Sequence, residues 1–275
     1  MLYHLVSGNP HGPVVLMGSS LGTTSRMWEN QLPYLEKDFR VIRFDTTGHG
    51  QSLEGIQQTA PGESSKATVA DFATQVLDLA DHLGVDTFSY VGLSLGGAIG
   101  QQLALDAPER IEKLVLTCTA AKFGQPQIWQ DRAKAVRENG MGWLREPSAG
   151  KWYTEGFADQ DKQAQVLLEE LVVLDPQGYA TACDAVSRFD ATDRLGQITI
   201  PTLVIAGAQD VSTPPAVVEV LAQGIPNTEF HVVDGAAHLG NIEAPEEFGR
   251  LIGEFLRRDL STARTGESAT ANQAS

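Results

Sequence analysis

Short apolar runs alternate with helical stretches along most of the chain. Each run is four to six residues long and most end at a glycine or a polar turn residue; they cover Val14–Met17, Phe39–Phe44, Thr87–Val91, Ile111–Leu116, Thr202–Ala206 and Glu229–Val233. Helical patterns occupy the intervals, as in Val69–Leu83 and Leu95–Ala107. Strands buried on both faces read as continuous apolar runs, so the pattern predicts an α/β fold with a mostly parallel sheet flanked by helices.

The alternation stops between about residues 122 and 195. This stretch is mainly helical in pattern and holds three of the four tryptophans, Trp129, Trp143 and Trp152. A helical insertion in an α/β sheet indicates a cap over the carboxyl ends of the strands, where such sheets bind ligands. We therefore expect a core made of residues 1–121 and 196–260, and a helical cap at 122–195.

Two polar segments carry no hydrophobic period. Residues 57–66 (QQTAPGESSK) contain proline and glycine and are expected to form a surface loop. Residues 261–275 (STARTGESATANQAS) are expected to form a disordered tail.

The balance of charge narrows the range of partners. The 275 residues carry a formal net charge of −15, whereas nucleic acids and anionic membranes bind concentrated positive charge. An anionic small-molecule substrate would therefore depend on local cations. Two cysteines, Cys118 and Cys183, are too few for a disulfide framework and are expected to be small buried hydrophobic residues. The sequence contains no signal peptide and no apolar run of about 18 residues, so a cytoplasmic location is expected, and oligomeric state stays open.

The strongest local signal is the sequence Gly92-Leu93-Ser94-Leu95-Gly96. It follows a predicted strand directly and opens a predicted helix. A serine on such a sharp turn has strained backbone angles, and the glycines on either side give the turn room. The turn lifts the hydroxyl above the sheet at a helix N-terminus, which favours developing negative charge. We predict that Ser94 is a nucleophile rather than a solvated turn serine.

A serine nucleophile needs a base within hydrogen-bond reach. Of the six histidines, His238 alone lies in a loop between the last predicted strand and a helix that begins near Ala244, at the carboxyl edge that also carries Ser94. His49 lies in the turn GHG, where an imidazole more often ties a loop together. The remaining four lie on strands, turns or polar helix faces: His4, His11, His82 and His231.

An acid must orient the far nitrogen of the histidine ring. Asp210 follows the strand Thr202–Ala206 in the loop GAQD, again at the carboxyl edge. Asp234 is a rival, but four residues before His238 it is better placed to cap the strand end, and Asp45 is better placed to stabilise the turn TTGHG. The chain order Ser94, Asp210, His238 is that of an α/β-hydrolase triad.

The tetrahedral oxyanion of acyl transfer needs two fixed donors. The backbone N–H of Leu95 is one candidate, and the backbone N–H of Leu21, in the loop after the strand Val14–Met17, is the other. No histidine, cysteine or carboxylate cluster has the spacing of a zinc site, so no metal is expected.

Several further motifs resemble those of the 3-oxoadipate enol-lactonases. The resemblance extends from Tyr3 to Leu256 and is carried by SSLGT (19–23), DTTGHGQS (45–52), VGLSLGG (91–97), TAAK (119–122), PQGYA (176–180) and AAHLGNIE (236–243). GxSxG and GHGxS are shared by the wider superfamily, whereas TAAK, PQGYA and SLGT are narrower. Four positions depart from the usual residues of the family, with Ser19 for Asn, Thr47 for Arg, Leu95 for Met and Gly240 for Ser.

The resemblance implies hydrolysis of a carboxylated enol-lactone in aromatic catabolism, by the triad Ser94, Asp210 and His238 without a cofactor. Trp129 and Trp152 are expected to bind substrate. The carboxylate needs a cation in the cap; Lys122 is our first choice, since it lies closest in sequence to the sheet edge. The other candidate cations are Arg145, Lys151 and Arg188.

Other functions on the same scaffold stay open. An esterase, a different lactonase or a carbon–carbon bond hydrolase would use the same triad, and so would a cofactor-free haloperoxidase-like enzyme. A ligand-binding receptor that has kept the fold without turnover belongs to a different class, and the complete triad speaks against it. Haloalkane dehalogenases and epoxide hydrolases need aspartate at position 94 and are disfavoured.

Overall fold

The computed structural model describes residues 1–56, 59 and 63–258. The strands are β1 (His4–Gly8), β2 (Val14–Gly18), β3 (Arg40–Phe44), β4 (Phe88–Leu93), β5 (Ile111–Thr117), β6 (Thr202–Gly207) and β7 (Thr228–Val233). The α-helices are α1 (Leu32–Leu35), α2 (Val69–His82), α3 (Leu95–Asp106), α4 (Pro126–Asn139), α5 (Arg145–Trp152), α6 (Phe157–Gln160), α7 (Lys162–Val173), α8 (Pro176–Arg188), α9 (Pro215–Gly224), α10 (Gly240–Glu243) and α11 (Pro245–Arg257). Short 3₁₀ helices are η1 (Ser25–Gln31), η2 (Pro108–Arg110), η3 (Gly142–Leu144) and η4 (Thr192–Gln197).

The described strands form one sheet in the order β1-β3-β2-β4-β5-β6-β7. Only the β1–β3 pair is antiparallel, and the other five pairs are parallel. Apolar side chains of the inner strands are inaccessible to solvent, as at Val15, Leu16 and Val204. The predicted mostly parallel sheet is confirmed, and each predicted strand lies within two residues of an observed one.

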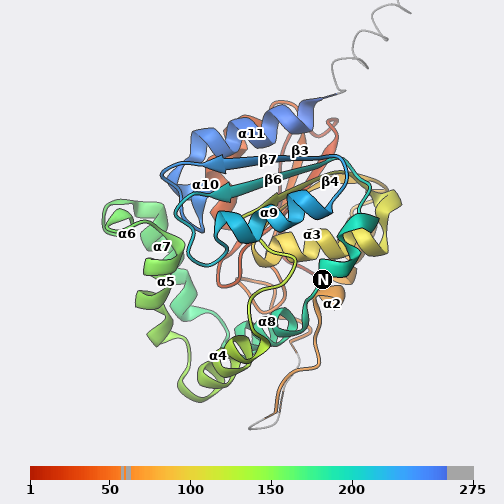
Figure 1. Cartoon of the computed structure of the whole chain (residues 1–275). Coiled ribbons are helices and arrows are strands. Elements are labelled where there is room, and N and C mark those ends of the chain that lie inside the picture. The colour runs from red at the N-terminus through yellow and green to blue at the C-terminus, as the bar shows by residue number, and fades with distance from the viewer. Residues whose placement is uncertain (57–58, 60–62, 259–275) are drawn as a thin grey trace, which may run out of the picture.

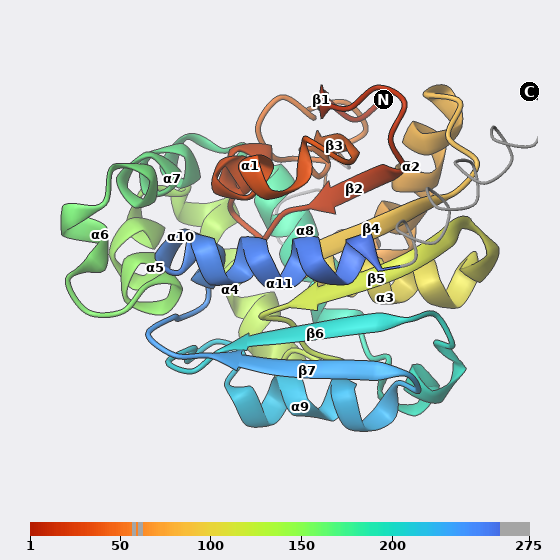
Figure 2. The same cartoon turned by 90° about the horizontal axis from the view of Figure 1, so that it is seen from above.

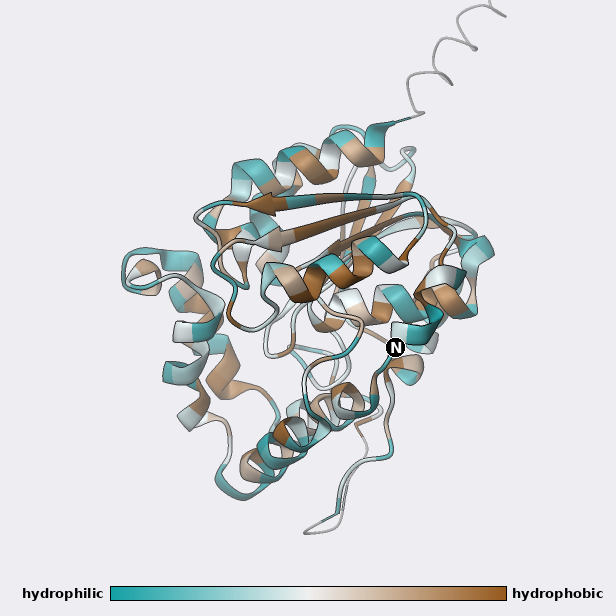
Figure 3. Ribbon diagram, in the orientation of Figure 1, coloured by the Kyte–Doolittle hydropathy of each residue, from teal (hydrophilic) through white to brown (hydrophobic). Residues whose placement is uncertain are grey.

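Helices cover both faces of the sheet (Figure 1). Helices α1 and α11 lie on one face, and α2, α3 and α9 lie on the other, as Figure 2 shows from above. Helix α11 buries Phe248, Leu251, Ile252 and Phe255, whose spacing of three and four residues forms one apolar stripe. Hydrophobic colour gathers on the strands and on the inner sides of the helices in Figure 3. The main core therefore lies between the sheet and its two helical layers.

Helices α4 to α8, which we call the cap helices, form a single insertion between β5 and β6. They lie beyond the end of the sheet toward which the arrowheads of β6 and β7 point (Figures 1 and 2). The two ends of the insertion meet: the Ala191 N–H donates to the carbonyl of Ala121 at 2.9 Å, and Lys122 pairs with Asp190 at 2.8 Å. We call these four residues the neck.

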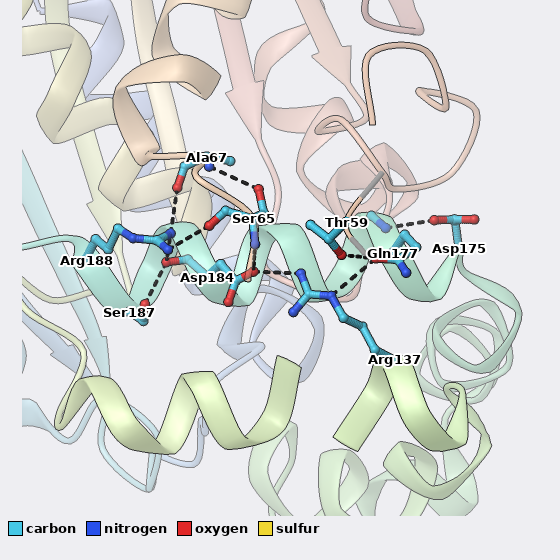
Figure 4. Close-up of polar contacts among 10 residues, drawn as sticks. Thr59, Ser65, Ala67, Arg137, Asp175, Gln177, Asp184, Ser187 and Arg188 are labelled. Atoms are coloured by element: carbon cyan, nitrogen blue, oxygen red, sulfur yellow. Dashed lines mark hydrogen bonds and ion pairs between the residues drawn. The ribbon is translucent and has the colours of Figure 1, made fainter. Parts of the chain in front are cut away.

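A polar cluster ties the cap helices to the core (Figure 4). The carboxylate of Asp184 on α8 is buried, and it accepts a 2.6 Å bond from Arg137 on α4 and a 2.7 Å bond from the amide of Ser65, in the segment before α2. Arg188 donates to the carbonyls of Ser65 and Ala67 at 2.6 and 3.1 Å. We call Arg137, Asp184, Arg188 and Ser65 the clasp. Because Arg137 carries the opposite charge, burial of Asp184 leaves no isolated ion.

Two expectations lie partly or wholly outside the described residues. Residues 57–58 and 60–62 of the expected surface loop and the whole expected tail, 261–275, are among those that the structure does not describe. Both cysteines are free and buried, as predicted. Within the described ranges, every helix is too short or too polar to cross a bilayer.

Candidate active site

Ser94 lies at the turn between β4 and α3. Its backbone has φ 55° and ψ −112°, a region that side chains rarely adopt. Ladder pairing extends β4 to Leu93, opposite Thr117 of β5, so the chain must reverse within one residue to begin α3. The Ser94 N–H donates to the Thr117 carbonyl at 3.1 Å, and the Ser94 carbonyl accepts from the Thr119 hydroxyl at 2.7 Å. These contacts hold the strained turn in place.

Close backbone contacts explain the glycines of this motif. A methyl group at Gly92 would lie 2.2 Å from the Gly96 carbonyl oxygen, and one at Gly96 would lie 2.2 Å from the Gly18 carbonyl oxygen. The Gly96 N–H also donates to the Ser19 carbonyl at 3.0 Å. The turn that carries Ser94 is therefore packed directly against the loop that follows β2.

His238 and Asp210 form a buried hydrogen-bonded pair. The loop after β7 carries His238 and the loop after β6 carries Asp210, and His238 Nδ1 lies 2.8 Å from Asp210 Oδ2. His238 Nε2, the other ring nitrogen, has no hydrogen-bond partner among the residues that the structure describes. Ser94 and His238 line the same cavity. A hydroxyl, an imidazole and a carboxylate in this order can generate an activated alkoxide.

Four donors fix the carboxylate of Asp210. Besides His238, the amides of Ser212 and Thr213 donate to Oδ1 at 2.7 and 2.9 Å, and the Thr213 hydroxyl donates to Oδ2 at 2.7 Å. Burial alone raises the pKa of Asp210, but His238 and the Thr213 donors outweigh it and hold that pKa below its usual value. The acid is thus ionised and oriented toward the imidazole. Sequence reasoning did not single out Thr213.

The histidine loop is also fixed from the cap side. One oxygen of Glu243, on α10, accepts from the amide and the hydroxyl of Thr154, both at 2.7 Å, and its other oxygen accepts from the Ala237 amide at 2.5 Å. The Leu239 N–H donates to the Trp152 carbonyl at 2.9 Å. Leu239 is therefore bonded directly to the end of α5, and Ala237 is linked through Glu243 to Thr154, just after that helix.

In the loop after β2, the amides around Leu21 are already hydrogen-bonded. Ser20 N–H points to the sulfur of Met27, Gly22 N–H donates to His49, and Thr23 N–H donates to the Ser20 carbonyl. Within the described residues the Leu21 amide has no such partner, and Leu21 lines the cavity. The Leu95 amide, at the first turn of α3, likewise has no partner in the described part of the chain. Both amides remain the predicted oxyanion donors.

The cavity has a volume of about 410 Å³ and is largely aromatic on the cap side. The core contributes Ser20, Leu21, Ser94 and His238. The cap segment contributes the aromatic residues Phe123, Trp129, Trp143, Trp152 and Tyr179. Trp129 and Trp152, the two tryptophans expected at the substrate site, therefore both lie in its wall.

Two cations, Arg132 and Lys151, also line this cavity. Arg132 lies 5.0 Å from the centre of the Trp129 ring. Burial lowers the pKa of Lys151, and the neighbouring Arg132 lowers it further. No carboxylate within the described ranges forms an ion pair with either side chain. Asp131 lies in the same wall, but its carboxylate accepts a 2.8 Å hydrogen bond from the Gln127 side chain and forms no ion pair with either cation in the described part of the chain. Two like charges that no neighbouring carboxylate pairs with are suited to bind an anion.

The structure does not bring Lys122 into the cavity, which corrects our first choice of cation. Lys122 is half exposed and pairs with Asp190 at the neck. Proximity in sequence to the sheet edge was misleading, because the side chain of Lys122 pairs across the neck and the next residue, Phe123, is the one that lines the cavity. Arg145 pairs with Glu146, and Arg188 belongs to the clasp. Of the four expected cations, only Lys151 reaches the cavity.

Arg132 was missed by sequence reasoning, although a signal for it existed. It follows Trp129 by three residues on α4, so the two side chains share one face of that helix. A helix expected to present Trp129 to substrate therefore presents Arg132 as well.

His49 and Asp45, which the sequence analysis set aside as triad members, have the structural roles predicted for them. His49 is buried, and its Nε2 accepts from Gly22 N–H at 3.0 Å. Asp45 accepts from the Ser25 and Gln51 amides at 2.8 and 3.0 Å and so stabilises its turn.

Comparison with known proteins agrees with this architecture. Residues 13–245 match the model of the α/β hydrolase fold family. The chain is 34% identical to 3-oxoadipate enol-lactonase 2 of Acinetobacter baylyi over 94% of this chain and 93% of the relative. The enol-lactonase from Burkholderia xenovorans LB400 has a TM-score of 0.85 at 32% identity, covering 93% of this chain and 96% of that one. A thermophilic esterase from Thermogutta terrifontis has a TM-score of 0.83 at 30% identity, covering 94% and 93%.

These matches extend over the sheet, the triad loops and the cap helices alike. They agree with the resemblance to 3-oxoadipate enol-lactonases and with a hydrolase that acts on ester or lactone bonds. The chain therefore belongs to the α/β hydrolase fold family.

Proposed function

We propose that this hydrolase opens a small carboxylated enol-lactone, 3-oxoadipate enol-lactone, to give 3-oxoadipate. The observation that carries the proposal is the pair of cations Arg132 and Lys151, which lack a carboxylate partner in the described part of the chain and share a cavity with Ser94 and His238. A protein of net charge −15 repels anions at long range, so an anionic substrate would depend on local cations. The cation pair at the cavity wall supplies them and favours a substrate that carries a carboxylate.

In the proposed reaction, Ser94 attacks the lactone carbonyl while His238 Nε2 takes the hydroxyl proton. Asp210 stabilises the imidazolium that results. The Leu21 and Leu95 amides bind the oxyanion. When the tetrahedral intermediate collapses, the ring oxygen leaves as an enolate and His238 returns the proton to it. The ring-opened chain is now esterified to Ser94.

Hydrolysis of this acyl-enzyme repeats the same steps with water. His238 deprotonates the water, the oxyanion forms again, and the Ser94 oxygen leaves with the proton. The enol product relaxes to the ketone, and the product carries two carboxylates. The reaction uses no cofactor. We further propose that the cap helices supply the substrate's binding surface, with Trp129 and Trp152 against the lactone ring and Arg132 at its carboxylate.

Three similar proteins support this substrate class. The proteins from Acinetobacter baylyi and Burkholderia xenovorans carry the name enol-lactonase, and the esterase from Thermogutta terrifontis was solved with malate, itself a carboxylate, bound.

The test compares a carboxylated enol-lactone with an uncharged lactone of similar shape. Arg132→Met should lower kcat/KM for the charged lactone by about ten- to a hundredfold, the range of a charge-assisted hydrogen bond, and leave the uncharged lactone nearly unchanged. Lys151→Met should act in the same direction. Lys122→Met is the matched control, since Lys122 lies at the neck, and it should affect neither substrate.

Equal effects on both lactones would contradict the proposal. So would turnover of neutral p-nitrophenyl esters that matches turnover of the enol-lactone. Either result would make a general esterase the better assignment.

A further inference from the structure

His49 is a buried histidine that the proposed reaction does not use. It lies in the turn after β3, its side chain is inaccessible to solvent, and it is hydrogen-bonded to the loop after β2. Its Nε2 accepts from the Gly22 N–H at 3.0 Å, so this nitrogen carries no proton. The ring proton is then on Nδ1, which lies 3.5 Å from the Thr47 carbonyl oxygen.

The partner of His49 directly follows Leu21 in the chain. Gly22 has φ +87°, and a side chain there would collide with Leu171, Trp152 and Tyr179. The position therefore has to be glycine, the residue with the greatest backbone freedom. The hydrogen bond to His49 fixes the orientation of the Gly22 amide and, through it, the peptide chain at Leu21.

The turn that carries His49 is itself rigid. The His49 N–H donates to the Thr46 carbonyl at 2.8 Å, and the Gly48 N–H donates to the Ser52 carbonyl at 2.7 Å. Gly48 also lies against Gly178 of α8 so closely that a methyl group on either would fall 2.3 Å from the other's Cα. The turn thus holds His49 in a fixed position, from which its side chain orients the loop after β2.

We infer that His49 is a positioning residue, whose neutral imidazole holds the Gly22 amide so that the Leu21 amide faces the reacting carbonyl. The inference rests on the oxyanion role proposed for Leu21. It does not rest on the enol-lactone, because the same oxyanion forms on Ser94 with any ester.

Low proton affinity agrees with this role. Burial lowers the pKa of His49 to about 4, against smaller opposing effects of Thr47 and Asp45. The ring of Tyr179 on α8 faces it at 6.3 Å between ring centres. Near neutral pH the imidazole is therefore an acceptor at Nε2, as the Gly22 bond requires.

The test uses p-nitrophenyl acetate, with three substitutions at position 49. A glutamine oxygen can reach the place of Nε2, whereas an asparagine oxygen stops near the place of Nδ1 and leucine offers no acceptor. His49→Leu and His49→Asn should lower kcat by about ten- to a hundredfold with little change in KM, less than the ~10²–10³-fold loss when a donor is removed outright. His49→Gln should retain kcat within about threefold of the wild type, because its side-chain oxygen still accepts from the Gly22 N–H. KM should change little in all three variants, since ground-state binding is unchanged.

A boronic acid that forms a tetrahedral adduct on Ser94 provides the second readout. Its affinity should fall in parallel with kcat in the leucine and asparagine variants, since the adduct places an oxygen at the oxyanion site. Ser52→Ala is the matched control: it removes the acceptor of the Tyr3 N–H in the same turn and leaves the Gly22 bond intact. It should lower the melting temperature without lowering kcat.

Three outcomes would overturn the inference. These are full kcat in a folded His49→Leu or His49→Asn protein, equal loss in His49→Gln, or a kcat loss in Ser52→Ala that scales with its lowered melting temperature. If the folded wild-type protein hydrolysed no ester or lactone at all, that result would instead reject the proposed function itself.

Discussion

At the scale of single residues, Ser94 combines its proposed role as nucleophile with backbone strain. Its φ of 55° lies in a region where a residue other than glycine costs about 1–3 kcal/mol. Glycine at this position would relieve that strain. Its greater freedom in the unfolded chain would lower the free energy of unfolding by only about 0.4–1 kcal/mol. Strain relief is the larger effect.

We therefore expect Ser94→Ala and Ser94→Gly both to abolish ester hydrolysis, and Ser94→Gly to melt at the higher temperature of the two. Thermal unfolding of the two purified variants and a burst-phase ester assay measure these effects. Residual kcat above about a tenth of the wild-type value in Ser94→Ala would remove this serine from the mechanism. Equal melting temperatures would show that the turn holds no strain.

The lowered pKa of His49 also makes the stability of the folded protein depend on pH in the acid range. Its pKa is about 4 in the folded protein and about 6.5 in the unfolded chain, so the unfolded chain binds more protons between these values. The stability that His49 contributes is fully present above about pH 6.5 and is lost as the pH falls through about 4.

Denaturant titrations of wild type and His49→Gln from pH 7 to pH 4 should show this difference. The free energy of unfolding should fall more steeply for the wild type, because glutamine does not titrate. Parallel curves would show that His49 is not held neutral in the fold.

At the scale of elements, the clasp decides where α4 and α8 lie over the cavity. Arg137 and Asp184 are almost fully buried, so loss of one partner leaves an isolated charge. We expect Asp184→Ala to lower the free energy of unfolding by about 3–5 kcal/mol. Arg137→Met combined with Asp184→Leu should cost less than Asp184→Ala alone.

A double-mutant cycle of Arg137→Met, Asp184→Leu and the combined variant, followed by chemical denaturation, measures this coupling. Because α4 carries Trp129 and Arg132, the Asp184→Ala protein should also show a raised KM for the charged lactone with a smaller change in kcat. Additive stability effects of the two single changes would show that the clasp is a set of independent surface contacts.

The elements also show how far the sequence alone could predict the site. Strand ends were predictable because buried strands read as apolar runs that stop at turn residues, and this placed Ser94, Asp210 and His238 at one edge of the sheet. The cap could be predicted to be helical but not oriented. Lys122 was chosen by its sequence distance from β5, and only the fold reveals that this stretch closes the neck. Arg132 depends on the rotation of α4 against α8, which side-chain packing decides.

At the scale of the whole molecule, the charge of −15 and the two cavity cations act on an anionic substrate at different ranges. The Debye length falls from about 30 Å at 0.01 M salt to about 8 Å at 0.15 M. Added salt therefore screens the distant carboxylates first and leaves contacts inside the cavity mostly unscreened.

We expect kcat/KM for the charged lactone to rise over this range of salt, and kcat/KM for an uncharged lactone to stay constant. Steady-state kinetics at constant pH, with both substrates, measures the contrast. A fall in kcat/KM for the charged lactone would mean that attraction by the cavity cations already dominates at long range.

The closed neck has a consequence for how this enzyme could diversify. Helices α4 to α8 leave the core and return to it at two points joined by the Ala191–Ala121 hydrogen bond, while Ser94, Asp210 and His238 all belong to the core. A different helical segment with the same narrow base could be grafted there without stretching the backbone or moving the triad. Replacing the whole insertion in this way could change the substrate preference in one recombination event, while the Lys122–Asp190 pair holds the two ends of the new segment together at the neck.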